Sequence, residues 1–172
     1  MRAFFFMAVM MGIASASALA EELVKSGRIG LDSASSACIG SNATPVCAAE
    51  TLLACLFRAD GTLCRQAGLD PRTITREPTI VATEYAIDRV SVIRAEDVTE
   101  DLRDVDWFKP GFALVELRQR MCRAADCEDA DWDDVQVYAQ PVDNGWRIVT
   151  WRGDIGQENA PDIPDAFRAK QP

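Results

Sequence analysis

The stretch TPVCAAETLLACLF, residues 44–57, decides the fold of this chain because it predicts the longest helix. Thr44 is a favoured N-cap residue, and Pro45 suits the first helical position, where its missing N–H costs nothing. Apolar side chains then recur at spacings of three and four residues, which places them in one stripe along a helix. We expect a helix over residues 45–58 that buries this stripe, whose members are Val46, Ala49, Leu53, Leu56 and Phe57.

The residues after this helix predict one short helix and then only strands. Residues 62–67 suit a helix that Gly68 ends. Consecutive strands joined by short turns must pair in antiparallel fashion, and Asp143-Asn144-Gly145 is a strong hairpin signal between the last two. We therefore expect an α+β domain, with one long and one short N-terminal helix packed on a curved antiparallel sheet of about four strands. The strand signals cover residues 79–94, 112–121, 135–142 and 146–152.

Two details of the strand pattern bear on where side chains point. In residues 79–94 the alternation changes phase at Asp88-Arg89, which indicates either a β-bulge or a strand buried on both faces. In the last strand, simple alternation puts Trp146 and Trp151 on opposite faces, so at most one of them should enter the core. Trp107 and Trp132 are the other tryptophans, and any of the four could line a pocket or mark an interface.

The chain has six cysteines, all of which follow the secretory signal-peptide pattern of residues 1–20, so we predict three disulfides. Cys122 and Cys127 should bridge a tight polar turn. We do not expect them to bind metal, because the spacing of this pair is loose and no Cys-x2-Cys motif is present. The six are Cys38, Cys47, Cys55, Cys64, Cys122 and Cys127.

The remaining four cysteines leave two pairings open. Cys47 and Cys55 would lie about 12 Å apart on one helix, whereas a disulfide needs Cα atoms within about 7 Å. The alternatives are Cys38–Cys47 with Cys55–Cys64, or Cys38–Cys55 with Cys47–Cys64. We favour the first, because it closes each end of the helix locally.

Residues 1–20 have the pattern of a secretory signal peptide, with a charged start, an apolar run of about 12 residues and small residues up to Ala20. This run is shorter than the roughly 20 residues that span a bilayer, so we expect no membrane anchor. Cleavage after Ala20 would leave Glu21 rather than a lipid-carrying cysteine, and the protein should be periplasmic or secreted. The expected segments are a signal peptide (1–20), an extended arm (21–43), a single α+β domain (44–153) and a polar tail (154–172).

The composition excludes several classes of function. The net charge of −9 argues against binding to nucleic acid, whose phosphates require Lys and Arg, and against an anionic membrane surface. The chain has no histidine, which excludes Ser-His-Asp and Cys-His nucleophile systems and histidine-based metal sites. Any catalysis would depend on carboxylates, Tyr, Lys, Arg or Cys, and nothing in the sequence points to a cofactor.

Three stretches resemble the nuclear-transport-factor-2-like superfamily, within the cystatin-like α+β folds. They are the helix start at Thr44-Pro45, the RADG exit at 58–61 and the closing NGWRI at 144–148. The resemblance covers about residues 44–152 and implies helices packed into the hollow of a curved antiparallel sheet. Some members are enzymes with a Tyr and Asp pocket, whereas many others bind ligands or only support assembly. No catalytic motif matches, and the six cysteines and the missing third helix depart from the family.

Five polar strand residues are the candidates for lining a binding pocket: Tyr85, Asp88, Glu116, Arg118 and Tyr138. We predict no metal site. The spacing of Asp129, Asp131 and Asp133 is that of a calcium loop, but an EF-hand would also need Gly at position 134 and Glu at position 140, where this chain has Asp134 and Gln140. A solvated loop kept soluble by charge is the interpretation we favour for this stretch.

Three functions fit these observations. The favoured one is a periplasmic or secreted binding or interaction module. The second is a small pocket enzyme, such as an isomerase, lyase or dehydratase, that uses a carboxylate and a tyrosine. The third is an envelope accessory protein that acts only through a partner. The candidate partners are accordingly a small ligand, an envelope protein or a second copy in a homodimer.

Overall fold

The computed structural model describes residues 25–31, 36 and 38–153. The predicted signal peptide with its cleavage site after Ala20, and the predicted tail at 154–172, lie outside the described residues. Within the described part, neither helix has the length and apolar character needed to cross a bilayer.

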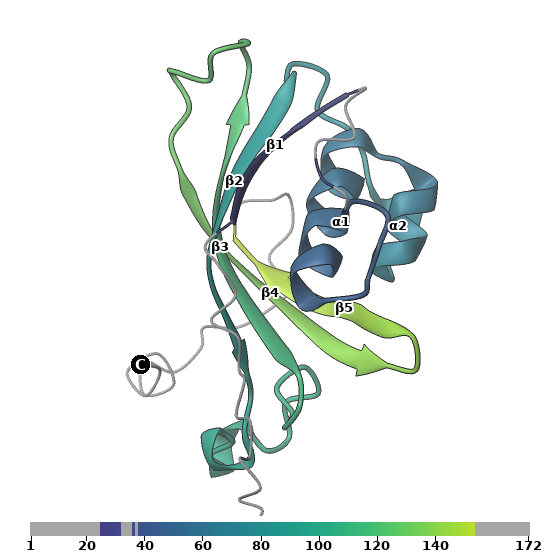
Figure 1. Ribbon diagram of the computed structural model, residues 1–172, viewed down its shortest axis with the longest axis vertical. Coiled ribbons are helices and arrows are strands. Elements are labelled where there is room, and N and C mark those ends of the chain that lie inside the picture. The colour runs from purple at the N-terminus through teal and green to yellow at the C-terminus, as the bar shows by residue number, and fades with distance from the viewer. Residues whose placement is uncertain (1–24, 32–35, 37, 154–172) are drawn as a thin grey trace, which may run out of the picture.

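The described residues form two helices and one antiparallel sheet of five strands, which confirms the predicted α+β class (Figure 1). The strands follow one another across the sheet in chain order, so each pairs with its sequence neighbours. The elements are β1 (Lys25–Gly30), α1 (Pro45–Arg58), α2 (Gly61–Ala67), β2 (Ala82–Val92), β3 (Ala113–Cys122), β4 (Asp133–Val142) and β5 (Gly145–Arg152).

The predicted number of about four strands is too low by one, because β1 comes from the arm expected at 21–43. Its residues KSGRIG offer only Ile29 to the core, so they show no alternating apolar pattern. The strand is held by backbone pairing with β2 over its whole length. Gly27 lies opposite Tyr85, and a Cβ at this position would overlap the phenol group of that tyrosine.

The first helix has the predicted bounds, and the second begins one residue earlier than predicted, at Gly61, and ends before Gly68 as predicted. The Thr44 side chain accepts a hydrogen bond from the backbone N–H of Cys47 at 3.1 Å, and α1 ends at Ala59, which has a left-handed φ of 51°. Asp60 then caps α2 by accepting from the first backbone N–H groups of that helix. Gly68, with φ of 86°, ends α2 and donates its N–H to carbonyls of the last turn. Local capping is therefore enough to define this pair of helices.

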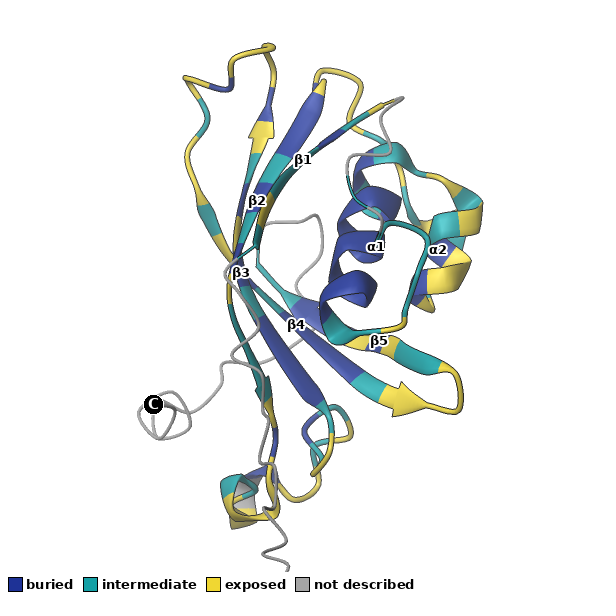
Figure 2. Cartoon of the chain, in the orientation of Figure 1, coloured by how far each residue is buried: buried dark blue, intermediate teal, exposed yellow. Residues whose placement is uncertain are grey.

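The sheet curves around α1, and the face that contacts α1 is here called the inner face (Figure 1). Nearly the whole length of α1 is buried, whereas α2 is largely exposed on the far side of α1 (Figure 2). Burial of this apolar layer, at about 25 cal/mol per Å2, is the main stabilisation of the fold. The inner face contributes, among others, Ile29, Tyr85, Ile87, Val115, Leu117, Val135, Val137, Ile148 and Trp151.

The opposite, outer face is covered at one end by the segment between β2 and β3. This segment contains two short 3₁₀ turns, Ala95–Asp97 and Glu100–Leu102. It packs Phe108 onto the outer face beside Leu114 and Tyr138, and these side chains form a second apolar cluster. The middle of the outer face carries charged side chains, among them Glu84, Asp88, Glu116, Arg118 and Arg120, and a small apolar cluster of Ala82, Cys122 and Cys127 lies at the end of β3.

Two irregularities in the sheet determine which face several side chains occupy. Between Ile87 and Arg89 the pairing with β3 skips Asp88, so the predicted phase change is a β-bulge. A second shift lies in β5, where Ile148 and Thr150 pair with consecutive residues of β4 and Val149 is skipped.

The bulge in β5 makes the prediction for the two tryptophans of that strand wrong. Trp151 is buried in the core cluster, and Trp146 packs against the same cluster. Both therefore lie on the inner face, because the extra residue at Val149 reverses the alternation between them.

The favoured disulfide pairing is confirmed. Cys38 pairs with Cys47 and Cys55 with Cys64, at Cα separations of 4.5 and 4.8 Å. The first bridge ties the preceding loop to the start of α1, and the second joins the end of α1 to α2. Cys122 pairs with Cys127 across the turn after β3, at a Cα separation of 4.7 Å.

Candidate functional site

The structure does not bring the five predicted site residues together, because alternation along the strands divides them between the two faces of the sheet. Tyr85 lies on the inner face and contacts α1. Tyr138 lies on the outer face, but within the second apolar cluster, where its ring is 4.6 Å from that of Trp107. Only Asp88, Glu116 and Arg118 lie on the polar part of the outer face.

These three residues belong to two ion pairs across β2 and β3. Arg118 donates two hydrogen bonds to the Asp88 carboxylate, at 2.8 and 2.9 Å. One strand position away, Arg89 donates to Glu116 at 2.7 Å. The bulge explains this arrangement, since it places two consecutive residues of β2, an acid and a base, opposite a base and an acid of β3.

An open cleft of about 410 Å3 lies over the bulge and is the candidate binding site on this face. Leu117 and Val135, in the middle of the sheet, also line it, although their side chains belong to the core of the inner face. Its polar wall contains three carboxylates and a single guanidinium, so the negative groups outnumber the positive ones. The polar residues are Asp88, Arg89, Glu116, Asp134 and Gln136.

Trp132, beside this cleft, is the most exposed aromatic side chain of the outer face. Its side chain is 42% exposed, and the guanidinium carbons of Arg120 and Arg118 lie 4.8 and 5.8 Å from the ring centroid. Both distances are within the range of a cation–π contact. The indole is therefore held against two arginines that are themselves fixed by ion pairs.

Arg120 belongs to a series of linked ion pairs at the edge of the sheet. Arg120 donates to Glu84 at 2.6 Å, and the same carboxylate accepts from Arg28 of β1 at 2.9 Å. Arg28 also donates to the backbone carbonyl of Ala125 at 2.6 Å, which ties the loop after β3 to β1. No pattern within a single strand predicts these linked ion pairs, because their members come from three separate strands.

The inner face contains a buried polar cluster built around Glu50 of α1. Glu50 is 0% exposed and accepts a hydrogen bond from the Tyr85 hydroxyl at 2.7 Å. It also forms an ion pair with Lys25 at 2.7 Å and accepts from the Ser36 hydroxyl at 2.5 Å. The sequence contains one signal for this cluster: Glu50 is an acidic residue in the middle of a helix that is otherwise almost entirely apolar.

This cluster raises the pKa of Tyr85 well above its ordinary value of about 10. Burial of the ring is the main cause, and the hydrogen bond to Glu50 and the negative charge of that carboxylate add to it. Tyr85 is therefore a protonated donor at physiological pH. The cluster joins β1, β2 and α1. Its carboxylate is not available to a substrate, because Glu50 is fully buried and both of its oxygens are engaged.

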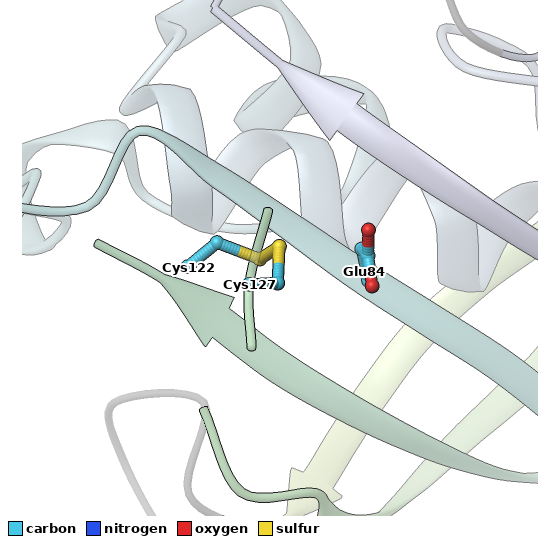
Figure 3. Close-up of side chains that lie close together, drawn as sticks. All are labelled: Glu84, Cys122 and Cys127. Carbon is cyan, nitrogen blue, oxygen red and sulfur yellow. A yellow bond between two sulfur atoms is a disulfide. The ribbon is translucent and has the colours of Figure 1, made fainter. Parts of the chain in front are cut away.

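The potential metal ligands do not form an available site. Among the described residues, one group of three lies within 4.8 Å, namely Glu84, Cys122 and Cys127 (Figure 3). The two sulfur atoms are bonded to each other, so no thiolate is present to bind an ion. Asp129, Asp131 and Asp133 do not gather into such a group in the described structure, which gives the calcium alternative no support.

Comparison with known proteins finds no family model, no curated protein and no solved structure that matches this chain.

Proposed function

We propose that this chain is an exported, disulfide-stabilised interaction module that binds another protein through the outer face of its sheet. The observation that carries the proposal is Trp132, an exposed indole packed against two arginines that are fixed by ion pairs, two residues before Asp134 of the open cleft. Trp and Arg are the residues most enriched at the energetic centres of protein interfaces. Because Arg118 is already ordered by its ion pair with Asp88, little side-chain entropy would be lost on binding.

The alternative of a pocket enzyme has less support. Its expected signature was a carboxylate beside a tyrosine in a deep cavity, and Glu50 and Tyr85 do form such a pair. However, Glu50 is 0% and Tyr85 only 1% exposed, so neither group is open to a substrate.

A distant relationship to the nuclear-transport-factor-2-like superfamily remains part of the proposal. Two helices on the inner side of a curved antiparallel sheet support it. The three disulfides support export, because such bonds persist in oxidising compartments. The mass of the purified protein tests export directly, since cleavage after Ala20 and three disulfides define a single expected value.

Photocrosslinking in the cells that make the protein tests the interface. A benzophenone amino acid is placed at position 130, two residues before Trp132, so that the indole is retained, and, as a matched control, at position 66, where Gln66 is exposed on α2 behind the helix layer. We expect a discrete protein adduct from position 130 and none from position 66. Equal labelling from both positions, or none from position 130, would contradict the proposal.

A further inference from the structure

We infer that the partner presents a basic polypeptide segment, which lies over Trp132 and places a cationic side chain in the cleft at Asp88. This inference rests on the proposed function and names the chemistry of the partner. It follows from the charge of the outer face, the shape of the cleft and the exposed indole.

The charge around Trp132 is net negative, because the two arginines against its ring, Arg118 and Arg120, are each paired with a carboxylate of β2, whereas the loop that bears the tryptophan is mostly acidic. Within residues 123–134, which contain the tryptophan, six carboxylates face a single positive side chain, Arg123. Most of them are exposed, and the loop that bears them is held in place by the Cys122–Cys127 disulfide and by Arg28. The carboxylates belong to Asp126, Glu128, Asp129, Asp131, Asp133 and Asp134.

The cleft continues this negative field from the loop onto the sheet. Asp134 lines it together with Asp88 and Glu116, while Arg89 supplies the one positive group of its wall. Asp88 and Glu116 each have one arginine partner, which leaves further oxygen lone pairs on both carboxylates for a second donor. A guanidinium or ammonium group fits this wall, whereas an anionic ligand would meet three carboxylates.

The indole adds the apolar part of the recognition. A Trp face accepts Arg and Lys side chains by stacking and cation–π contact. The two arginines already against the ring occupy part of it, and 42% of the side chain stays exposed for a partner. The net charge of −9 would also steer a basic partner toward this protein over longer distances.

The test is a titration of the oxidised protein with a fluorescent peptide rich in Arg and Phe, and with its counterpart carrying Glu for every Arg. The decisive variants remove two charges each with the same residue type and spacing. Asp129→Asn with Asp131→Asn neutralises the loop beside Trp132. Asp104→Asn with Asp106→Asn neutralises two exposed acids in the segment between β2 and β3.

We expect the basic peptide to bind and the acidic one not to bind. The Asp129/Asp131 variant should weaken binding about tenfold and Trp132→Ala by a similar factor. The Asp104/Asp106 variant should change it less than twofold, because it alters only the net charge. Equal weakening by both double variants would mean unspecific attraction to an acidic protein and would overturn the inference.

A final arm separates this inference from the proposed function. The crosslinker at position 130 is combined with Asp129→Asn and Asp131→Asn. A protein adduct that persists at full yield, together with no preference for the basic peptide, overturns the basic partner and leaves the interaction module standing. Absence of every adduct from position 130 in the unmutated background overturns the proposed function itself. An adduct whose mass is that of a second copy of this chain also overturns the basic partner, in favour of a homodimer.

Discussion

Replacement of Glu50 by Gln should destabilise the fold by about 3 kcal/mol, although the two side chains have nearly the same shape. The carboxylate oxygens accept from Lys25 and Tyr85 on one side, both at 2.7 Å, and from Ser36 on the other, at 2.5 Å. The amide of Gln carries one acceptor and one donor, so it cannot satisfy donors on both sides. The strain of this mismatch falls inside the core, because Glu50 is 0% exposed.

The magnitude follows from the partners. If the amide oxygen faces Lys25 and Tyr85, two hydrogen bonds lose their charge assistance, at about 1 kcal/mol each. The amide N–H2 then faces the Ser36 oxygen, which already accepts from Lys25 Nζ and from the backbone N–H of Cys38, both at 3.1 Å. The resulting unsatisfied donor adds about 1–3 kcal/mol. Partial hydration of Lys25, whose side chain is 38% exposed, offsets some of this cost.

Urea unfolding followed by circular dichroism, with the disulfides intact, measures this change. For a domain of this size we also expect the melting temperature to fall by about 10 °C. Glu96→Gln is the matched control, because this side chain is 70% exposed and its ion pair with Arg94 is long, at 3.9 Å. The control should cost less than about 0.5 kcal/mol.

A loss of less than about 1 kcal/mol in the free energy of unfolding on Glu50→Gln would contradict this role of the buried carboxylate. Additive losses of stability from Glu50→Gln and Lys25→Gln would contradict it as well. The two residues share one ion pair, so the double variant should recover at least about 1 kcal/mol relative to the sum of the single changes.

Four further changes test other parts of the fold. Gly27→Ala should destabilise by about 1–3 kcal/mol in urea unfolding, because its Cβ would overlap the phenol of Tyr85, and unchanged stability would contradict this close approach. Tyr85→Phe should remove a loss of stability above about pH 10: the raised pKa means that the contribution of Tyr85 is complete below its unfolded value and is lost as pH rises through the folded one. Asp60→Ala should lower the stability by about 1 kcal/mol at neutral pH and by less near pH 2. Backbone N–H groups lower the pKa of the Asp60 carboxyl, so its contribution is lost as pH falls through that lowered value, and a cost independent of pH would argue against the cap. Cys55→Ala combined with Cys64→Ala should lower stability by about 2–4 kcal/mol, and a smaller change would show that α2 does not depend on its bridge to α1.

The parts of the fold that the sequence predicted are those controlled by neighbouring residues. Thr44 and Pro45 define the start of α1. The Thr44 side chain accepts a backbone hydrogen bond, and Pro45 lacks an N–H group at a position where it would have no partner within the helix. The helix rise alone excludes a Cys47–Cys55 bridge, which left the pairing of four cysteines to a choice between two local schemes. The phase change at Asp88 also appears in the sequence, because a bulge alters the alternation within a single strand.

The candidate site could be predicted only in part. The structure brings Asp88, Glu116 and Arg118 together, since they lie close to the bulge on adjacent strands. Tyr85 and Tyr138 lie apart from them, because the face of each residue depends on its register and on the segment that covers it. Tyr138 is an outer-face residue like Arg118, but the chain between β2 and β3 folds over it.

What the sequence determined by itself was the class of the domain, its helices, the Cys122–Cys127 bridge and most of its strands, since each follows from the pattern of residues close in the chain. It left two possible pairings for the other four cysteines. Tertiary structure decided the fifth strand, the common face of Trp146 and Trp151, and the cluster around Glu50. Each of these joins segments separated by many residues, so its free energy appears only when the sheet and α1 are assembled. No periodicity or spacing within a single element records such contacts.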